Sequence, residues 1–153
     1  MNATINQINK ELNSLADAHV QINSYFFGDF LDIYESETVE QTSLLANINN
    51  ATINQHYVTL KIELMVMSQI LNGKENVIDV ESDTLQIIND ILQVIKYSNK
   101  WQKLGKHEGN TEVLKFTEKG GDILNGWYCT LSFQVKKEQQ GFCDLPFINY
   151  DYE

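Results

Sequence analysis

Two segments of this chain alternate between apolar and polar side chains, over residues 57–67 and, strictly, over residues 126–135. Side chains of a β-strand point alternately to its two faces, so this pattern predicts two strands with one face in a core and the other polar. The first segment ends in Met65-Val66-Met67, so its far end must be covered on both faces by a helix or by another subunit. The alternating apolar positions are Val58, Leu60, Ile62, Leu64 and Val66, followed by Trp127, Cys129, Leu131, Phe133 and Val135.

A long helix is expected between these two strands, over residues 82–100. Ser82 is a favourable N-cap, and Asp83 follows in the first turn, where the helix dipole favours negative charge. Residues 77–80 are expected to form a short extended segment before it. The helical stripe consists of Leu85, Ile88, Leu92 and Ile95, widened by Ile87, Ile91 and Val94. So wide an apolar face predicts burial on more than one side.

The first part of the chain combines a helix with a bent strand. Apolar residues recur at steps of three and four over residues 5–22, which predicts a helix that begins near Asn2 or Thr4. This stripe covers fewer than three heptads, so a helix packed on a sheet is favoured over a coiled coil. Residues 25–34 are interpreted as one strand bent at Gly28.

Other segments are less regular. Residues 35–42 are polar and predict a solvated loop. Residues 44–54 indicate a strand interrupted by a turn or bulge at Asn49-Asn50. Residues 103–125, rich in glycine, lysine, glutamate and asparagine, predict a loop that contains a short strand at residues 113–116.

Together these elements predict one α+β domain over residues 1–153, with an antiparallel sheet of about four strands flanked by an N-terminal and a central helix. A domain of this length can bury roughly 70% of the surface that its unfolded chain exposes, so it needs no disulfide, and both cysteines are expected to be reduced. No apolar run approaches the roughly 18 residues of a membrane span. The N-terminus also lacks the pattern of a signal peptide. We therefore expect no membrane contact.

The net charge of −10 is distributed unevenly. Residues 1–95 hold thirteen acidic residues against three lysines, whereas residues 96–153 hold eight of each. A helix dipole favours cations near its C-terminal end, which explains the lysines that end the central helix. These are Lys96, Lys100, Lys103 and Lys106. The chain has no arginine, the side chain best suited to read guanine, which argues against sequence-specific DNA binding.

No motif for catalysis or metal binding is recognisable. Asp79, Glu81 and Asp83 alternate but do not complete a calcium loop, and neither a nucleophile elbow nor a phosphate-binding glycine loop is present. The histidines, none of them in a metal-binding spacing, are His19, His56 and His107. A carboxylate such as Asp144 disfavours a reactive thiolate at its neighbour Cys143. We therefore expect no enzymatic activity, no catalytic residue, no cofactor and no metal.

Three stretches of the sequence, together with the order of the expected elements, resemble a known protein family. They are residues 80–91, Gly126-Trp127-Tyr128 at the start of the last strand, and Cys143-Asp144-Leu145-Pro146 after it. With the order helix, aromatic strand, hairpin, buried helix and strand, they resemble tail-terminator and tail-completion proteins of tailed bacteriophages, over roughly residues 15–147. The resemblance implies a structural virion protein of the neck, assembled in the host cytoplasm. It also implies a homo-oligomeric ring, a hexamer or dodecamer, around a DNA channel at the head-to-tail junction, with no active site.

The acidic residues and the apolar residues at two segment ends are consistent with such a ring. Five acids without a cation would repel phosphate, so we expect them to face a channel that DNA crosses without specific binding. Apolar residues at the end of one strand and in a C-terminal segment, residues 142–153, are expected to contact other copies and neighbouring neck, portal or tail-tube proteins. The channel-facing set is Asp29, Asp32, Glu35, Glu37 and Glu40. The interface set is Met65, Met67, Phe142, Leu145, Phe147, Tyr150 and Tyr152.

Two other functions stay open from the sequence. An acidic protein of this kind would mimic DNA and occupy a nucleic-acid enzyme, and strongly salt-dependent binding to such an enzyme without ring formation would favour this alternative. A hydrolase would depend on His107 or Cys143, and substitution of either residue would then abolish its activity.

Overall fold

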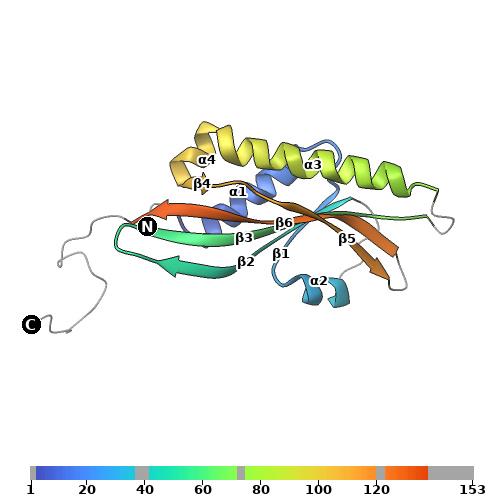
Figure 1. The fold of residues 1–153 in the computed structure, drawn as a ribbon, viewed down its shortest axis with the longest axis horizontal. Helices are drawn as coiled ribbons and strands as arrows, with labels where there is room; N and C mark the ends of the chain where they lie inside the picture. The colour runs from blue at the N-terminus through green and yellow to red at the C-terminus, as the bar shows by residue number, and fades with distance from the viewer. Residues whose placement is uncertain (1–2, 37–41, 72–74, 120–122, 138–153) are drawn as a thin grey trace, which may run out of the picture.

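The computed structural model describes residues 3–36, 42–71, 75–119 and 123–137. In Figure 1, helices α1, α3 and α4 lie over one face of a sheet and α2 lies under the other face. The elements in chain order are α1 (Ile5–Ala18), β1 (Ser24–Phe27), α2 (Phe30–Ser36), β2 (Ser43–Ile53), β3 (Tyr57–Gln69), α3 (Val77–Tyr97), α4 (Asn99–Leu104), β4 (Lys106–Glu108), β5 (Val113–Lys119) and β6 (Ile123–Lys136).

The sheet has six strands in the order β1-β2-β3-β6-β4, and β5 also pairs with β6. β1 runs parallel to β2, and the other pairs are antiparallel. The longest pairing joins β3 to β6, from Tyr57 opposite Lys136 to Gln69 opposite Leu124. The α+β class is therefore confirmed, but the expected count of about four strands is too low. β1 and β4 have only 4 and 3 residues, too few to display a period of two.

Helix α1 begins where its sequence provides a capping box. The Gln7 N–H donates to the Thr4 hydroxyl oxygen over 3.2 Å, and the Thr4 N–H donates to the Gln7 side-chain oxygen over 2.7 Å. Thr4 is therefore the N-cap, one of the two positions expected for it. The buried residues of α1 are Ile8, Leu12 and Ala16.

Helix α3 begins at Val77, well before the expected N-cap at Ser82, so residues 77–80 are helical rather than extended. The Val80 N–H donates to the Asn76 carbonyl over 2.9 Å, which closes the first turn. The Thr84 hydroxyl donates to the Val80 carbonyl over 2.5 Å, so this polar side chain is satisfied inside the core. The buried stripe is Val80, Thr84, Ile87, Ile88, Ile91 and Ile95. The apolar periodicity thus extends one turn earlier than the local polarity suggests.

The segment expected to be one bent strand, residues 25–34, forms β1 and then α2. Gly28 has a φ of 146°, a conformation that residues with a side chain rarely adopt, and the chain turns there. Asp29 Oδ1 then accepts hydrogen bonds from the N–H groups of Leu31 (2.9 Å) and Asp32 (3.4 Å). This capping starts a helix in a sequence whose apolar residues also fit a strand.

The other irregular segments are more ordered than expected. The register between β2 and β3 shifts between Ile48 and Asn50, which confirms the predicted interruption of that strand. Within residues 103–125, the chain completes α4 and then forms β4 and β5, with Gly109 (φ 75°) in the turn between these strands. The expected short strand at residues 113–116 extends to Lys119.

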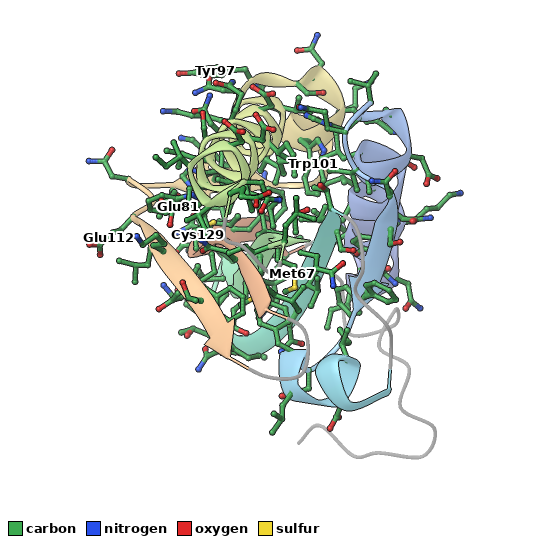
Figure 2. The ribbon with its side chains drawn as sticks, turned by 90° about the vertical axis from the view of Figure 1, so that its right-hand side faces the viewer. Met67, Glu81, Tyr97, Trp101, Glu112 and Cys129 are labelled. Carbon is green, nitrogen blue, oxygen red and sulfur yellow. The ribbon has the colours of Figure 1, made fainter. Side chains whose placement is uncertain are left out.

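A core lies on each face of the sheet. The larger core joins the sheet to α1, α3 and α4, and there the rings of Trp101 and Phe133 meet edge to face with 5.7 Å between centroids. The smaller core lies on the face toward α2, whose Ile33 packs with Met65 and Met67. Figure 2 shows Trp101 and Met67 on opposite sides of the sheet.

Met65 and Met67 are only 6% and 0% exposed. The prediction that they contact another subunit is therefore wrong for this fold. The strand end that is apolar on both faces is covered by helices of the same chain, since Phe30 and Ile33 of α2 and Phe116 of β5 complete the smaller core.

Candidate functional site

Of the five acids expected to face a channel, two are described with their side chains. Asp29 and Asp32 are exposed at the start of α2, where Asp29 caps the helix. Glu35 belongs to α2, but its side chain falls outside the described residues, as do Glu37 and Glu40. Helix capping explains Asp29 locally, so a channel-facing role for these acids stays a prediction.

The expected interface in the C-terminal segment also falls outside the described residues. Its members are Phe142, Leu145, Phe147, Tyr150 and Tyr152. Since Met65 and Met67 are buried within the chain, an interface in the described part must use other surfaces.

The outer edge of β2 is one such surface. β1 pairs only with residues 43–46 of β2. Among the described residues, no strand pairs with the outer side of residues 47–53, which we call the free edge of β2. These residues carry no charge, and residues 49–53 are exposed. A free edge is a template for pairing with another strand.

The backbone direction of this edge follows from the hairpin that joins β2 to β3. The Asn54 N–H donates to the Tyr57 carbonyl over 3.0 Å, so Asn54 points its backbone toward β3. Backbone groups alternate in direction along a strand, so Ala51 and Ile53 point theirs away from β3, toward the free edge. The Ile53 side chain is 70% exposed there.

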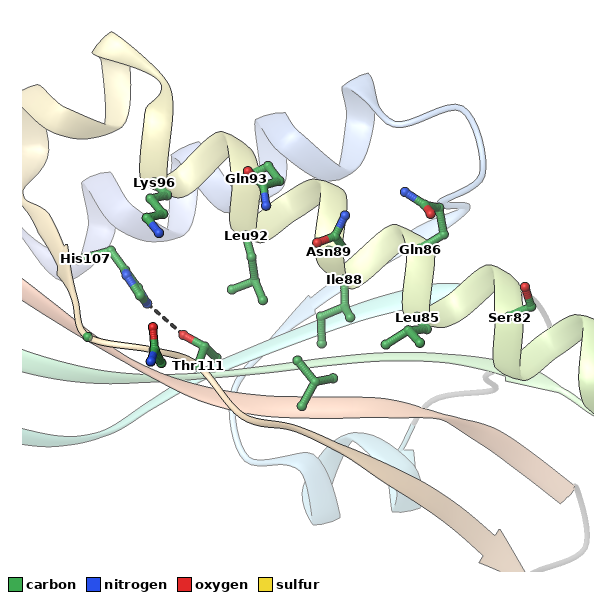
Figure 3. A pocket seen from close by; sticks show the side chains of 13 residues that line it. Ser82, Leu85, Gln86, Ile88, Asn89, Leu92, Gln93, Lys96, His107 and Thr111 are labelled. Atoms are coloured by element: carbon green, nitrogen blue, oxygen red, sulfur yellow. Dashed lines mark hydrogen bonds between the residues drawn. The ribbon is translucent and has the colours of Figure 1, made fainter.

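A groove of about 590 Å³ lies between α3 and the turn from β4 to β5 (Figure 3). The His107 ring nitrogen Nε2 lies 2.7 Å from the Thr111 hydroxyl oxygen. Burial lowers the pKa of His107, and the positive charge of Lys96 lowers it further, while Glu108 opposes the shift. The apolar side chains at this groove are Leu85, Ile88, Leu92 and Val113. Its described lining contains no carboxylate and no thiol, so His107 has neither a second acid nor a cysteine to work with.

The other titratable groups considered for catalysis are not brought together. Cys129 is buried, and burial raises the pKa of its thiol to about 12, so it stays protonated and unreactive. Cys143 falls outside the described residues. His19 Nε2 lies 3.5 Å from Asp90 Oδ2 of α3, and His56 is exposed in the β2–β3 turn.

Glu81 of α3 contacts both β5 and β6. The Asn125 amide donates to Glu81 Oε1 over 3.0 Å, and Lys115 Nζ lies 3.2 Å from the same oxygen. The hydrogen bond from Asn125, followed by that from Lys115, holds the pKa of Glu81 below its usual value. The Trp127 indole N–H donates to the Glu81 carbonyl over 2.8 Å. These contacts join α3 to β6 and β5, so their role is structural.

A second groove, of about 660 Å³, lies where α3, α4, β4 and the end of β6 meet, and we call it the basic groove. Its charged lining consists of Lys96, Lys103, Lys106, Lys136 and Glu108. Two tyrosines complete it, Tyr57 from β3 and Tyr97 from α3, with 40% and 63% exposed. A concentration of lysines in a chain of net charge −10 marks a local site for anions.

Comparison with known proteins gives no match, neither to a family model nor to a curated protein.

The basic groove was not predicted from the sequence, which assigned three of its four lysines, Lys96, Lys103 and Lys106, to the helix dipole and gave no role to Lys136. Lys106 joins Lys136 because β4 pairs with β6, with Lys106 opposite Gln134. This pairing depends on a strand of 3 residues, which is too short for its sequence pattern to predict it. The sequence does contain one indication of a basic surface, because lysines become as frequent as acidic residues after residue 95.

Within the described ranges, no cluster of three or more histidine, cysteine or acidic side chains could hold a metal ion. In the same part of the chain, no helix is long and apolar enough to cross a membrane.

Proposed function

We propose that this protein is a non-enzymatic structural subunit of a homo-oligomeric ring at the head-to-tail junction of a tailed phage. The proposal starts from the resemblance of the sequence to tail-terminator-like proteins. In the fold, α1, β1, the hairpin of β2 and β3, α3 and β6 occur in that expected order, with α2 added before the hairpin and α4, β4 and β5 added before β6. In this role the protein joins or terminates the tail tube and surrounds the channel through which DNA passes.

The free edge of β2 is the observation that carries the proposal. Its backbone N–H and C=O groups are available to a strand of another chain, and strand addition of this kind gives affinity through main-chain hydrogen bonds. Proteins that act alone usually protect such an edge with charged side chains or proline. Residues 47–53 contain neither.

The opposite edge of the sheet favours a ring over a two-fold dimer. There, no described strand pairs with the outer side of β5. Pairing of β2 in one copy with β5 in the next uses two different surfaces, and such heterologous contacts close into a ring when the rotation between copies permits. Pairing of β2 with β2 would give a two-fold dimer instead.

The charge of the chain fits a conduit that does not hold its DNA. Asp29, which caps α2, and Asp32 in its first turn are exposed, and carboxylates repel the phosphates of DNA. The absence of arginine from the sequence removes the side chain that most often reads bases in the major groove.

Electron microscopy and light scattering of the purified protein test the assembly. We expect annular particles at high concentration, or in the presence of tail tube. Ile53→Lys places a charge on the free edge and should abolish the rings. Val20→Lys, at a side chain that is 97% exposed outside the sheet, is the matched control and should leave them intact.

A wild-type protein that stays monomeric under both conditions would contradict the proposed function. Rings that tolerate Ile53→Lys would contradict the assignment of the interface. The phage context is tested separately by the neighbouring genes, which should encode portal, capsid and tail-tube proteins.

A further inference from the structure

We propose that the basic groove binds a short stretch of single-stranded nucleic acid, through its phosphates on the lysines and its bases on the two tyrosines. This inference is independent of the proposed ring, because no residue of β2 belongs to the described lining of the groove. It assigns a ligand class to a groove lined by four lysines in this acidic chain.

The lysines of the groove are available for a ligand. Lys103, Lys106 and Lys136 are exposed, and within the described part of the chain none of them pairs with a carboxylate. Glu108 is the single acid of the described lining.

The tyrosines distinguish this groove from a simple lysine patch. Tyr97 extends outward from the end of α3, as Figure 2 shows, and Tyr57 lies opposite Lys136 in the sheet. Lys96 Nζ lies 5.3 Å from the centroid of the Tyr97 ring, so the positive charge and the ring are held together. Proteins bind single-stranded nucleic acid by stacking its bases on exposed aromatic rings while nearby cationic side chains contact its phosphates. Every base has a face that can stack in this way.

The chemistry favours a single strand over a duplex and over an acidic protein. The bases of a duplex are stacked inside it, and exposing one costs energy. An acidic peptide would use the lysines but would give the tyrosines nothing to stack on. A volume of about 660 Å³ suits a few nucleotides, and the glutamines at its lining, Gln102 and Gln134, offer hydrogen bonds to bases or sugars.

Fluorescence anisotropy with a labelled oligothymidine of twelve nucleotides tests the proposal. We expect binding at 50 mM salt, with the logarithm of the affinity falling against the logarithm of the salt concentration with a slope of about −3, if all four lysines contact phosphates. Lys103→Gln with Lys106→Gln should reduce this slope by about half. Lys10→Gln, on the exposed surface of α1, is the matched control and should leave the slope unchanged.

The tyrosines are tested in the same assay. Tyr97→Ala should weaken binding by roughly 5- to 150-fold, the range expected for the loss of one stacked base, and Tyr97→Phe should keep most of the affinity. Tyr57→Ala provides a second measurement at the other side of the groove. Both side chains are exposed, so the variants should unfold at the wild-type temperature.

The outcomes separate the alternatives. Preference for the oligonucleotide over heparin and over duplex DNA, together with loss of affinity in Tyr97→Ala, supports the proposal. No binding at 50 mM salt, equal competition by heparin with Tyr97→Ala unaffected, or tighter binding of the duplex would overturn it. If the wild type does not bind the oligonucleotide and the Lys103→Gln, Lys106→Gln variant loses self-association, the groove binds a second copy of this chain instead. None of these results depends on the Ile53→Lys test of the ring.

Discussion

The side-chain amide of Asn125 donates a hydrogen bond of 3.0 Å to the carboxylate of Glu81. Asn125 is 2% exposed in β6, and its own oxygen accepts from the Gly126 N–H at 2.8 Å and from the Thr117 hydroxyl at 3.3 Å. One buried side chain therefore connects α3, β5 and β6, at the end of the sheet where β5 forms its edge.

Replacing Asn125 with leucine should destabilise the fold by about 1–3 kcal/mol, because buried donors and acceptors lose their partners. Urea unfolding monitored by circular dichroism gives the free energy. Asn110→Leu, at an exposed asparagine in the turn before β5, is the control and should change stability by less than about 0.5 kcal/mol. Equal effects of the two variants would show that the Asn125 contacts add nothing.

Glu81 should make stability depend on pH. Its pKa is lower in the folded protein than the usual value of 4.5, so its carboxylate contributes stability above that value and loses it as the pH falls through the folded pKa. Urea unfolding should therefore show a larger difference between wild type and Glu81→Gln at pH 7 than at pH 3. Glu112→Gln, at an exposed glutamate, controls for the loss of one negative charge. A difference that does not change with pH would contradict this assignment.

Gly126→Ala should be among the most damaging single substitutions in β6. A Cβ atom at this position would lie 1.9 Å from the carbonyl oxygen of Val66 in β3, so the two longest strands would have to separate locally. We expect a loss of about 3 kcal/mol in chemical denaturation. Thr130→Ala, at an exposed position of the same strand, should cost less than about 1 kcal/mol. A stable Gly126→Ala protein would mean that β6 does not approach β3 this closely.

Cys129 should resist thiol reagents in the native state. Burial raises its pKa to about 12, so only on the order of one thiol in ten thousand is ionised at pH 8. In a Cys143→Ser background, labelling with a chromogenic disulfide should be slow in buffer and should accelerate as urea unfolds the protein. Rapid labelling of the native protein would indicate a reactive thiol and would reopen the question of catalysis.

The central strands could be predicted from the sequence because the determinant is local. Each alternating segment carries its own polarity pattern, and β3 and β6 appear close to the expected bounds. Thr4 could be identified for the same reason, since a capping box lies within four residues. Elements whose stabilising contacts are local can be read from one stretch of sequence.

The sequence-based predictions were wrong, or missed a feature, where contacts between residues far apart in the chain determine the structure. Phe30 and Ile33 fit a strand or a helix, and α2 forms because these side chains cover Met67 on the sheet. Met67 was predicted to lie at a subunit interface because the sequence did not predict α2, the helix that covers it. The basic groove depends on Lys106 and Lys136, which meet only through the register of β4 on β6.

Amide hydrogen exchange along β2 tests the central claim most directly. In the assembled protein, the N–H groups of Ala51 and Ile53 should become protected as strongly as those of β3, because the free edge then pairs with another copy. In dilute, dispersed protein the same two amides should exchange rapidly. If Ala51 and Ile53 exchange at the same rapid rate in both states, the free edge is not the surface that joins the subunits.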